Sequence, residues 1–251
     1  MQNRYFIDNT LALVCARGGS KGLKGKNYIQ LEKKPLIFFA IDKIIKNKFK
    51  YNCLSSDSKK IIKISNKYGL KSFFVRPKHL SLSNVSKFKV WKHALKKAEI
   101  HYNKKFKFLL DVEVTNPLTS PRDLSKFLKK FYVIKNAYDG MLCVRDSWKN
   151  PYFNIFVRKN NKFYTSIDSK KKIVSRQKAP KTYDHVSAMY IFKTSYIKKS
   201  NYLLDGKIAP YKLPLAKSIE IDSKDDYNLV KKIIKNKNLK LVEKLNIIIY
   251  K

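Results

Sequence analysis

Short apolar runs alternate with amphipathic stretches along most of the chain, and this alternation limits the fold more than any other feature of the sequence. Strands are predicted at residues 11–16, 52–56, 71–77, 106–114 and 140–144. Helices are predicted between them at 36–47, 58–69, 87–100 and 121–134. Strands and helices that alternate at this spacing form a parallel, doubly wound α/β sheet with helices on both faces.

Ligands of such a sheet bind beyond the carboxyl ends of its strands. The segments that follow the predicted strands are therefore the places to look for chemistry. They are residues 17–27, 55–57, 76–77 and 111–117.

The stretch from 148 to 185 breaks this rhythm. Its residues predict a hairpin that turns at 159–162, inserted across one edge of the sheet. Core strands are expected to resume at 187–192 and 218–222, and a last helix at 225–236. The 251 residues, with 44% hydrophobic side chains, are enough for one domain with a buried core, so residues 1–251 are interpreted as a single domain carrying this insertion.

The formal net charge of +38 raises the alternative of a nucleic-acid-binding protein. Only seven of the 56 basic residues are arginine, the side chain that recognition of phosphates and bases favours. Lysine is spread over every segment instead. We therefore attribute the charge to general lysine enrichment and expect no specific nucleic-acid site, although a basic surface attracts anionic substrates.

The amino-terminal residues lack the zones of a signal peptide, and the early apolar run at 11–16 is too short to cross a bilayer. The three cysteines are Cys15, Cys53 and Cys143, and each lies beside apolar residues, as buried free thiols do. These features predict a cytoplasmic protein with no membrane partner.

A glycine-rich loop follows the first predicted strand. Four of the seven glycines fall within 18–25, together with Arg17 and the lysines at 21, 24 and 26. Glycine lets backbone N–H groups approach an anion closely, and the cations neutralise it, so this loop predicts phosphate binding. Neither the Walker A spacing nor the dinucleotide fingerprint is present, which disfavours kinase-type ATP binding and NAD binding.

Two pairs of acidic residues alternate with apolar ones. In the segment SIEID, Glu220 and Asp222 share one face of the predicted strand, as positions two apart do, and two carboxylates there suit a hard cation. Asp111 and Glu113 repeat the pattern at the end of the strand at 106–114. Acids in an otherwise apolar strand are costly unless they bind something.

Several segments together resemble the acylneuraminate cytidylyltransferases, which make CMP-sialic acids. They are ARGGSKGLKGKN (16–27), SSDSKKI (55–61), RPKHLSLS (76–83), VTNPLTSPRDL (114–124), KNPYFN (149–154), RQKAP (176–180), SAMYIF (187–192) and SIEIDSKDDYNLV (218–230). Their order and spacing carry the resemblance. It implies a Rossmann-like α/β fold with a protruding segment, here 148–185, that builds a homodimer. It also implies transfer of CMP from CTP to a nine-carbon α-keto acid sugar, with release of pyrophosphate and a need for Mg²⁺.

The resemblance also implies roles for single residues. Arg17 and Lys26 would hold the triphosphate and offset the charge of the leaving pyrophosphate, and with Asp222 they form the predicted catalytic set. The remaining nucleotide-binding residues would be Ala16, Gly18, Gly19, Ser20, Lys21, Asn27 and Arg76. The sugar acid would meet Glu113, Arg176 and Tyr190. The predicted metal ligands are Asp222, Glu220 and Asp111.

This chain departs from the family pattern around the two substrate pockets. Val186-Ser187 replaces the usual Asn-Gly, and Thr119 replaces the usual Arg after Pro-Leu. Three interpretations therefore stay open: transfer to sialic acid or a bacterial relative such as legionaminic acid, transfer to another acidic sugar such as Kdo, and a basic nucleic-acid-binding protein built on a degenerate transferase fold.

Overall fold

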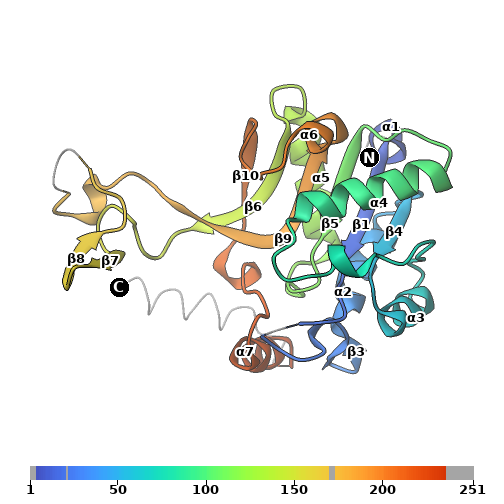
Figure 1. The fold of residues 1–251 in the computed structure, drawn as a ribbon, viewed down its shortest axis with the longest axis horizontal. Helices are drawn as coiled ribbons and strands as arrows, with labels where there is room; N and C mark the ends of the chain where they lie inside the picture. The colour runs from blue at the N-terminus through green and yellow to red at the C-terminus, as the bar shows by residue number, and fades with distance from the viewer. Residues whose placement is uncertain (1–3, 21, 170–172, 236–251) are drawn as a thin grey trace.

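The computed structural model describes residues 4–20, 22–169 and 173–235. Six strands form one sheet in the order β10-β6-β9-β5-β1-β4 (Figure 1). The strands are β1 (Thr10–Cys15), β4 (Asn52–Ser55), β5 (Phe108–Val112), β6 (Gly140–Asp146), β9 (Tyr183–Lys193) and β10 (Ile208–Lys212). Only β9 runs antiparallel to its neighbours, β5 and β6. The prediction of a mostly parallel α/β sheet is therefore confirmed.

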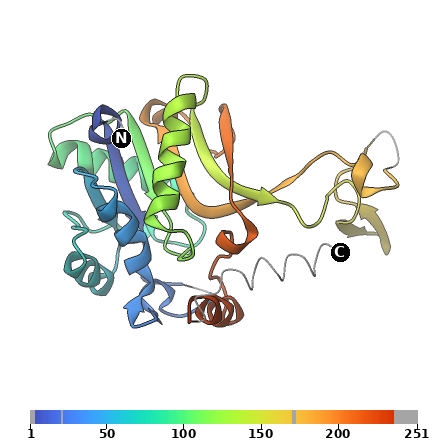
Figure 2. The ribbon, with the colours of Figure 1, turned by 180° about the vertical axis from the view of Figure 1, so that it is seen from behind.

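Helices cover both faces of the sheet. On one face α2 (Leu36–Lys46) packs against α5 (Pro121–Ile134), and on the other α4 (Lys87–His101) packs against α6 (Thr194–Lys199). Figure 1 shows α4 in front of the sheet, and Figure 2 shows α5 on the reverse side. Alternate residues of β1 point to the two faces, so Leu11 and Leu13 join one apolar core while Ala12 and Val14 join the other.

Local signals explain where the helices begin and end. Ser120 and Asp123 form a reciprocal capping box at the start of α5, with Pro121 as the first helical residue. Ser58 caps α3 (Lys59–Lys67), and Gly69, with a φ of 89°, provides the left-handed turn beyond its end. Three further helices are α1 (Arg4–Asp8), α7 (Lys224–Lys235) and the short 3₁₀ turn η1 (Lys26–Tyr28). No helix in the described ranges is long and apolar enough to cross a membrane.

The remaining elements are short. Two pairs of strands, β2 (Gln30–Leu31) with β3 (Lys34–Pro35) and β7 (Phe156–Lys159) with β8 (Lys162–Thr165), lie outside the main sheet. Single 3₁₀ turns are η2 (Lys78–Leu80), η3 (Arg176–Lys178) and η4 (Leu215–Lys217). The sequence pattern does not predict α1, α6 or β10, each of which is short.

Two predicted strands are wrong. Residues 71–77 run beside β4 but make only isolated backbone hydrogen bonds there. The hydroxyl of Ser72 donates to the carbonyl oxygens of Leu54 and Phe74. A hydroxyl that bonds the neighbouring backbone competes with a strand ladder. Residues 218–222 form no strand either; the N–H of Ile221 donates to the carbonyl of Thr115 at 2.8 Å in an isolated contact.

The segment 148–185 extends away from the sheet as an arm (Figure 1). Its hairpin of β7 and β8 turns at Asn160 and Asn161, both with positive φ, which confirms the hairpin and its turn. Many of its large apolar side chains are exposed: Ile155, Phe156, Val157, Phe163, Tyr164, Ile167 and Val174. The arm therefore presents an apolar surface that the other described residues leave exposed.

Candidate active site

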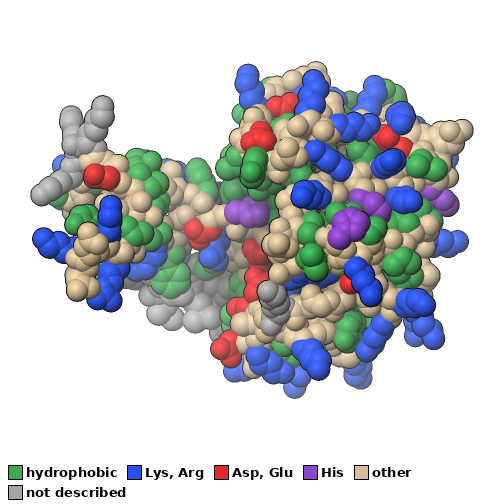
Figure 3. Space-filling model, in the orientation of Figure 1, with side chains coloured by type: hydrophobic (Ala, Val, Ile, Leu, Met, Phe, Trp, Pro, Cys, Tyr) green, Lys and Arg blue, Asp and Glu red, His purple; other side chains and the backbone are tan. Residues whose placement is uncertain are grey.

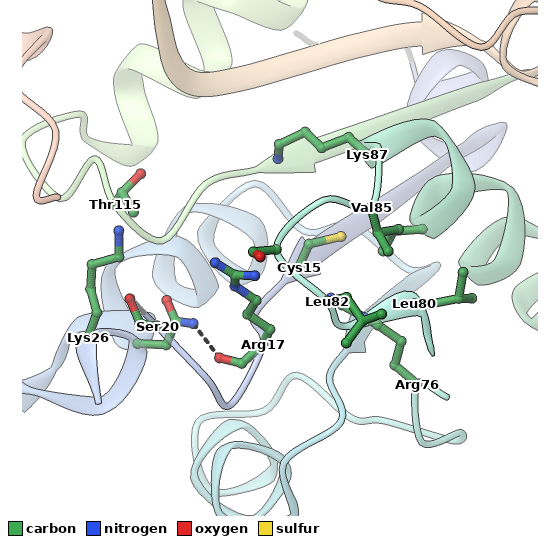
Figure 4. Close-up of a pocket in the computed structure, with 13 residues that line it drawn as sticks. Cys15, Arg17, Ser20, Lys26, Arg76, Leu80, Leu82, Val85, Lys87 and Thr115 are labelled. Atoms are coloured by element: carbon green, nitrogen blue, oxygen red, sulfur yellow. Dashed lines mark hydrogen bonds between the residues drawn. The ribbon is translucent and has the colours of Figure 1, made fainter. Parts of the chain in front are cut away.

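The glycine-rich loop leaves the carboxyl end of β1 and ends at η1. The amide of Asn27 donates to the carbonyl of Arg17 at 2.8 Å, which closes the loop on itself (Figure 4). The N–H of Gly18 donates to Asp57 Oδ1 at 2.8 Å, which ties the loop to the residues after β4. Gly25 has a φ of 68°, a backbone conformation that glycine adopts without strain. These bonds hold the two ends of the loop at the predicted edge of the sheet.

The segment that carries Asp222 packs directly on this loop. A Cβ added to Gly22 would lie 2.4 Å from the carbonyl oxygen of Asp222. Lys26 Nζ contacts Asp222 Oδ1 at 2.7 Å, with the lysine side chain 14% exposed and the aspartate side chain 70% exposed. The fold thus joins two predicted catalytic residues that are 196 positions apart in the sequence.

A cavity of about 240 Å³ opens beside the loop. Figure 4 shows the charged ends of Arg17, Lys26 and Lys87 reaching toward it from different elements. The predicted nucleotide-binding residues on its wall are Arg17, Ser20, Lys26, Asn27 and Arg76. The remaining lining is Cys15, Leu80, Leu82, Ser83, Val85, Lys87, Val90 and Thr115. A cavity with several cations beside a glycine-rich loop suits a polyphosphate.

Other nucleotide-binding predictions have different surroundings. Ala16 is fully buried beneath the loop, whereas Gly19 is exposed with open space around its Cα. Arg76 is buried, and its guanidinium donates to the hydroxyl and carbonyl oxygens of Ser55. Arg76 therefore shapes the cavity wall while anchored to β4. The prediction for Lys21 lies outside the described residues.

Asp111 and Glu113 lie at the carboxyl end of β5, both buried. Trp91 Nε1 donates to Asp111 Oδ2 at 2.7 Å, and Lys87 Nζ lies 3.2 Å from the same oxygen. Lys87 also forms an ion pair with Glu113. Neither Lys87 nor Trp91 is among the predicted site residues, and nothing in so lysine-rich a sequence distinguishes Lys87.

Glu220 is half-buried, and its Oε1 accepts a hydrogen bond from the N–H of Ser187 at 2.8 Å. Burial raises the pKa of Glu220, and the neighbouring charge of Asp222 raises it further, while hydrogen bonds from Ser187 act in the opposite direction. The two carboxylates therefore repel each other, and a cation placed between them would relieve that repulsion. In the described ranges, no three His, Cys, Asp or Glu side chains come together as a ready-made metal site.

Two of the predicted sugar-binding residues, Tyr190 and Arg176, lie in different parts of the fold. Tyr190 pairs with Asp111 across β9 and β5, is 1% exposed, and packs against Trp91 with ring centroids 5.6 Å apart. Burial raises the pKa of the Tyr190 hydroxyl. Arg176 lies on the arm, where its guanidinium donates to the carbonyl of Trp148 at 2.7 Å. The fold of one chain does not bring Arg176 to the cavity wall.

Comparisons with known proteins identify the family of the chain. The sequence model of the cytidylyltransferase family matches residues 11–250. The chain is 33% identical to the CMP-N,N'-diacetyllegionaminic acid synthase of Campylobacter jejuni, over 91% of this chain and 96% of that protein. It is 32% identical to post-translational flagellin modification protein B of Campylobacter coli, over 93% and 98%. It is 27% identical to the pseudaminic acid cytidylyltransferase of Campylobacter jejuni, over 90% and 96%.

Solved structures show the same fold. A CMP:2-keto-3-deoxy-manno-octonic acid synthetase complexed with CTP superposes with a TM-score of 0.64 at 13% identity, covering 91% of this chain and 99% of that chain. The 4-diphosphocytidyl-2C-methyl-D-erythritol synthase of Anaerococcus prevotii gives a TM-score of 0.61 at 13% identity, over 91% and 99%. These matches confirm the resemblance found in the sequence, and the chain belongs to the cytidylyltransferase family.

Proposed function

We propose that this protein transfers CMP from CTP to a nine-carbon α-keto acid sugar of the sialic, legionaminic or pseudaminic acid type. The observation that carries the proposal is the cavity lined by Arg17 and Lys26, together with the ion pair that joins Lys26 to Asp222. The relatives named for CMP-legionaminic and pseudaminic acid synthesis, matched along 90% or more of this chain, support the choice of sugar.

In the proposed reaction, the anomeric hydroxyl oxygen of the sugar attacks the α-phosphorus of CTP. The new O–P bond forms as the bond from the α-phosphorus to the bridging oxygen breaks, and that electron pair leaves with pyrophosphate. The hydroxyl proton passes to water. Transfer of this kind depends mainly on positioning and charge stabilisation. Arg17 and Lys26 would supply positive charge at the leaving group, and the backbone N–H groups of the loop would bind phosphate oxygens.

We assign the Mg²⁺ site of this reaction to Glu220 and Asp222. Mg²⁺ binds through one or two carboxylates together with substrate phosphates and water, so two carboxylates suffice. The mutual repulsion of the two acids and the high exposure of Asp222 fit this role. When bound, the ion would stabilise charge on the phosphate oxygens. The third predicted ligand, Asp111, stays a prediction. Its Oδ2 accepts a hydrogen bond from Trp91 and pairs with Lys87.

The test of function is pyrophosphate release with each of the four nucleoside triphosphates and a panel of acidic sugars. The panel contains N-acetylneuraminic, legionaminic and pseudaminic acids, together with Kdo. We expect turnover with CTP and a nine-carbon acid. Equal turnover with ATP or GTP would refute the proposal, and a preference for Kdo would favour the alternative substrate.

The metal assignment is tested by Asp222→Asn, which keeps the shape of the side chain and removes its charge. We expect kcat to fall about 10²–10³-fold, as it does when one charge-stabilising group is lost. The Mg²⁺ concentration needed for half-maximal rate should rise. Asp225→Asn is the matched control, since it removes an equal charge from an exposed position three residues away. A folded Asp222→Asn protein with unchanged Mg²⁺ dependence would remove this residue from the site.

We also propose a cytoplasmic homodimer joined through the arm. The exposed apolar side chains of the hairpin support this assembly, because an isolated two-stranded hairpin is marginally stable without a partner surface. The free thiols of all three cysteines fit a reducing compartment. Sedimentation should give twice the chain mass at micromolar concentration, and Phe156→Lys should shift the protein toward the monomer. A wild-type monomer would refute the dimer.

We attribute the high positive charge to a general property of the surface. On the face drawn in Figure 3, Lys and Arg side chains are scattered over the body and the arm and do not form one stripe. Binding to DNA should be weak, indifferent to sequence and lost steeply with added salt. Tight, sequence-selective binding at physiological salt would overturn this interpretation.

A further inference from the structure

Lys87 places an ammonium group over the two buried acids at the end of β5. It is the first residue of α4, and its Nζ lies 3.2 Å from Asp111 Oδ2 and forms an ion pair with Glu113. Its side chain stays 39% exposed and forms part of the cavity wall. The acids are buried and the lysine is not, so the pairing faces the cavity.

Aromatic rings complete the surroundings of this ammonium. Lys87 Nζ lies 4.9 Å from the ring centroid of Tyr190 and 5.7 Å from that of Trp91. Both distances are within the range of cation–π attraction. Trp91 also donates to Asp111 Oδ2, so the indole fixes one of the carboxylates that hold the lysine. A cation site is therefore already built here, and it is filled by a side chain of the protein.

The combined charge of Asp111, Glu113 and Lys87, the three residues of an acidic wall, bears on which sugar can bind beside them. Without Lys87, the buried carboxylates of Asp111 and Glu113 would place two negative charges beside the proposed triphosphate site, where little water screens them. Lys87 cancels one of them. An ammonium has three N–H donors, of which Lys87 gives one to Asp111 Oδ2 while its charge pairs with Glu113, so a donor can point into the cavity.

Lys87 lies on the side of the cavity from which the sugar is expected to approach. The phosphate-binding loop lies on one side of the cavity, and Figure 4 shows Lys87 reaching in from the opposite side. In-line attack requires the sugar to approach the α-phosphate from the side away from the leaving pyrophosphate. We propose that Lys87 is a specificity-determining residue, whose charge lets this wall accept the carboxylate of an acidic sugar. This inference rests on the proposed function.

The experiment compares Lys87→Met with Lys89→Met, which removes an exposed lysine from the same helix. Steady-state KM values are measured for CTP and for the nine-carbon acid of the panel that the wild-type protein uses best. In Lys87→Met we expect the sugar KM to rise at least about tenfold, equivalent to about 1.4 kcal/mol. The KM for CTP should change less, and Lys89→Met should behave as wild type.

A second set of variants separates charge from folding. Lys87→Arg keeps the charge and should retain most of the sugar affinity. Lys87→Met/Glu113→Gln removes one negative charge with the positive one and so keeps the net charge of the wild-type acidic wall, and its sugar KM should lie below that of Lys87→Met alone. The methyl ester of the same sugar is used as a neutral competitor. The wild-type protein should bind the acid more tightly than the ester, and Lys87→Met should lose that preference. Melting curves accompany each variant.

The outcomes are distinguishable. Wild-type protein without turnover on any nine-carbon acid would refute the proposed function and this inference with it. Normal wild-type turnover with an unchanged sugar KM in folded Lys87→Met would refute the inference alone. Equal increases of both KM values, or retention of the acid-over-ester preference, would reduce Lys87 to a structural role. If Lys87→Met does not fold, Lys87→Arg and the double variant decide by the same comparison.

Discussion

Lys43 is a buried lysine behind the active-site loops, and its protonation should be visible in the stability of the whole protein. It lies in α2 and is 1% exposed. Its Nζ donates to the carbonyl of Asn116 at 2.8 Å and to the hydroxyl of Thr119 at 2.6 Å. Both acceptors are uncharged, so neither replaces the hydration that a buried ammonium loses.

Burial lowers the pKa of Lys43 from 10.5 to about 7. The surrounding ionisable groups act in the opposite direction and only partly offset burial: Cys143 on β6, Asp123 on α5 and Asp42 on α2. Between pH 7 and 10.5 the unfolded chain therefore holds a proton that the folded chain has released. The free energy of unfolding then rises with pH, because the unfolded state binds more protons.

The size of the effect follows from the pKa difference. Each pH unit in this window contributes at most about 1.4 kcal/mol. From pH 7 to pH 9 the gain should be about 2 kcal/mol, since Lys43 is still half protonated at the start. The full difference between the two pKa values corresponds to about 5 kcal/mol. An effect of this size is a large fraction of the stability of an ordinary domain.

The assay is urea unfolding of the wild-type protein and Lys43→Met at pH 7, 8 and 9. The wild-type curve should gain about 2 kcal/mol more than the variant over this range. Lys46→Met, an exposed position on the same helix, is the control and should keep the wild-type slope. The buried thiols, such as that of Cys143 with its pKa raised to about 12, act with the opposite sign above about pH 8.5 in all three proteins. Parallel pH dependence in wild type and Lys43→Met would refute a buried, deprotonating lysine.

Two further predictions concern the loop and the buried acids. Gly22→Ala should lower both kcat/KM and the melting temperature, because the new Cβ would lie 2.4 Å from the carbonyl oxygen of Asp222 and must displace the loop. Gly19→Ala meets open space and should keep the wild-type melting temperature; steady-state kinetics of Gly22→Ala and melting curves of both variants check this. Trp91→Phe removes the donor to Asp111 Oδ2 and should destabilise the protein by about 1–3 kcal/mol in urea unfolding, as the loss of a buried hydrogen-bond partner does.

The parts of the fold that the sequence predicted are those with strong apolar patterns. The runs at 11–16 and 140–144 are continuous and apolar, which predicts buried strands, and nearly every residue of β1 and most of β6 is buried. The helices at 87–100 and 121–134 have one apolar stripe each, and the second also has its capping box. The direction of β9 could not be predicted, because a core strand buried on both faces has the same composition in either direction.

The part of the candidate site that could be predicted is the loop, where the residues that carry the chemistry are adjacent in the sequence. Four glycines among cations indicate phosphate binding in any fold, so the loop could be found. Lys87 could not, since its partners come from a strand more than twenty residues away. The sequence did indicate that Asp111 and Glu113 need a partner, and the structure supplies it within the same chain. The cost of burying two acids predicts that a partner exists, but not which one.

Glu220 and Asp222 were expected to share one face of a strand at 218–222, and that strand is absent, yet the fold brings Asp222 to the loop. Without a strand ladder, the segment that carries them is held by Asn116 and Thr115. The side-chain amide of Asn116 donates to the carbonyl of Lys217 at 2.9 Å, and Ile221 donates to Thr115 at 2.8 Å. Because Ile221 is fully buried, the acids on either side of it point elsewhere: Asp222 reaches Lys26 at the loop, and Glu220 accepts a hydrogen bond from the N–H of Ser187 on β9. One buried isoleucine and two anchors thus produce the alternation that a strand would have given.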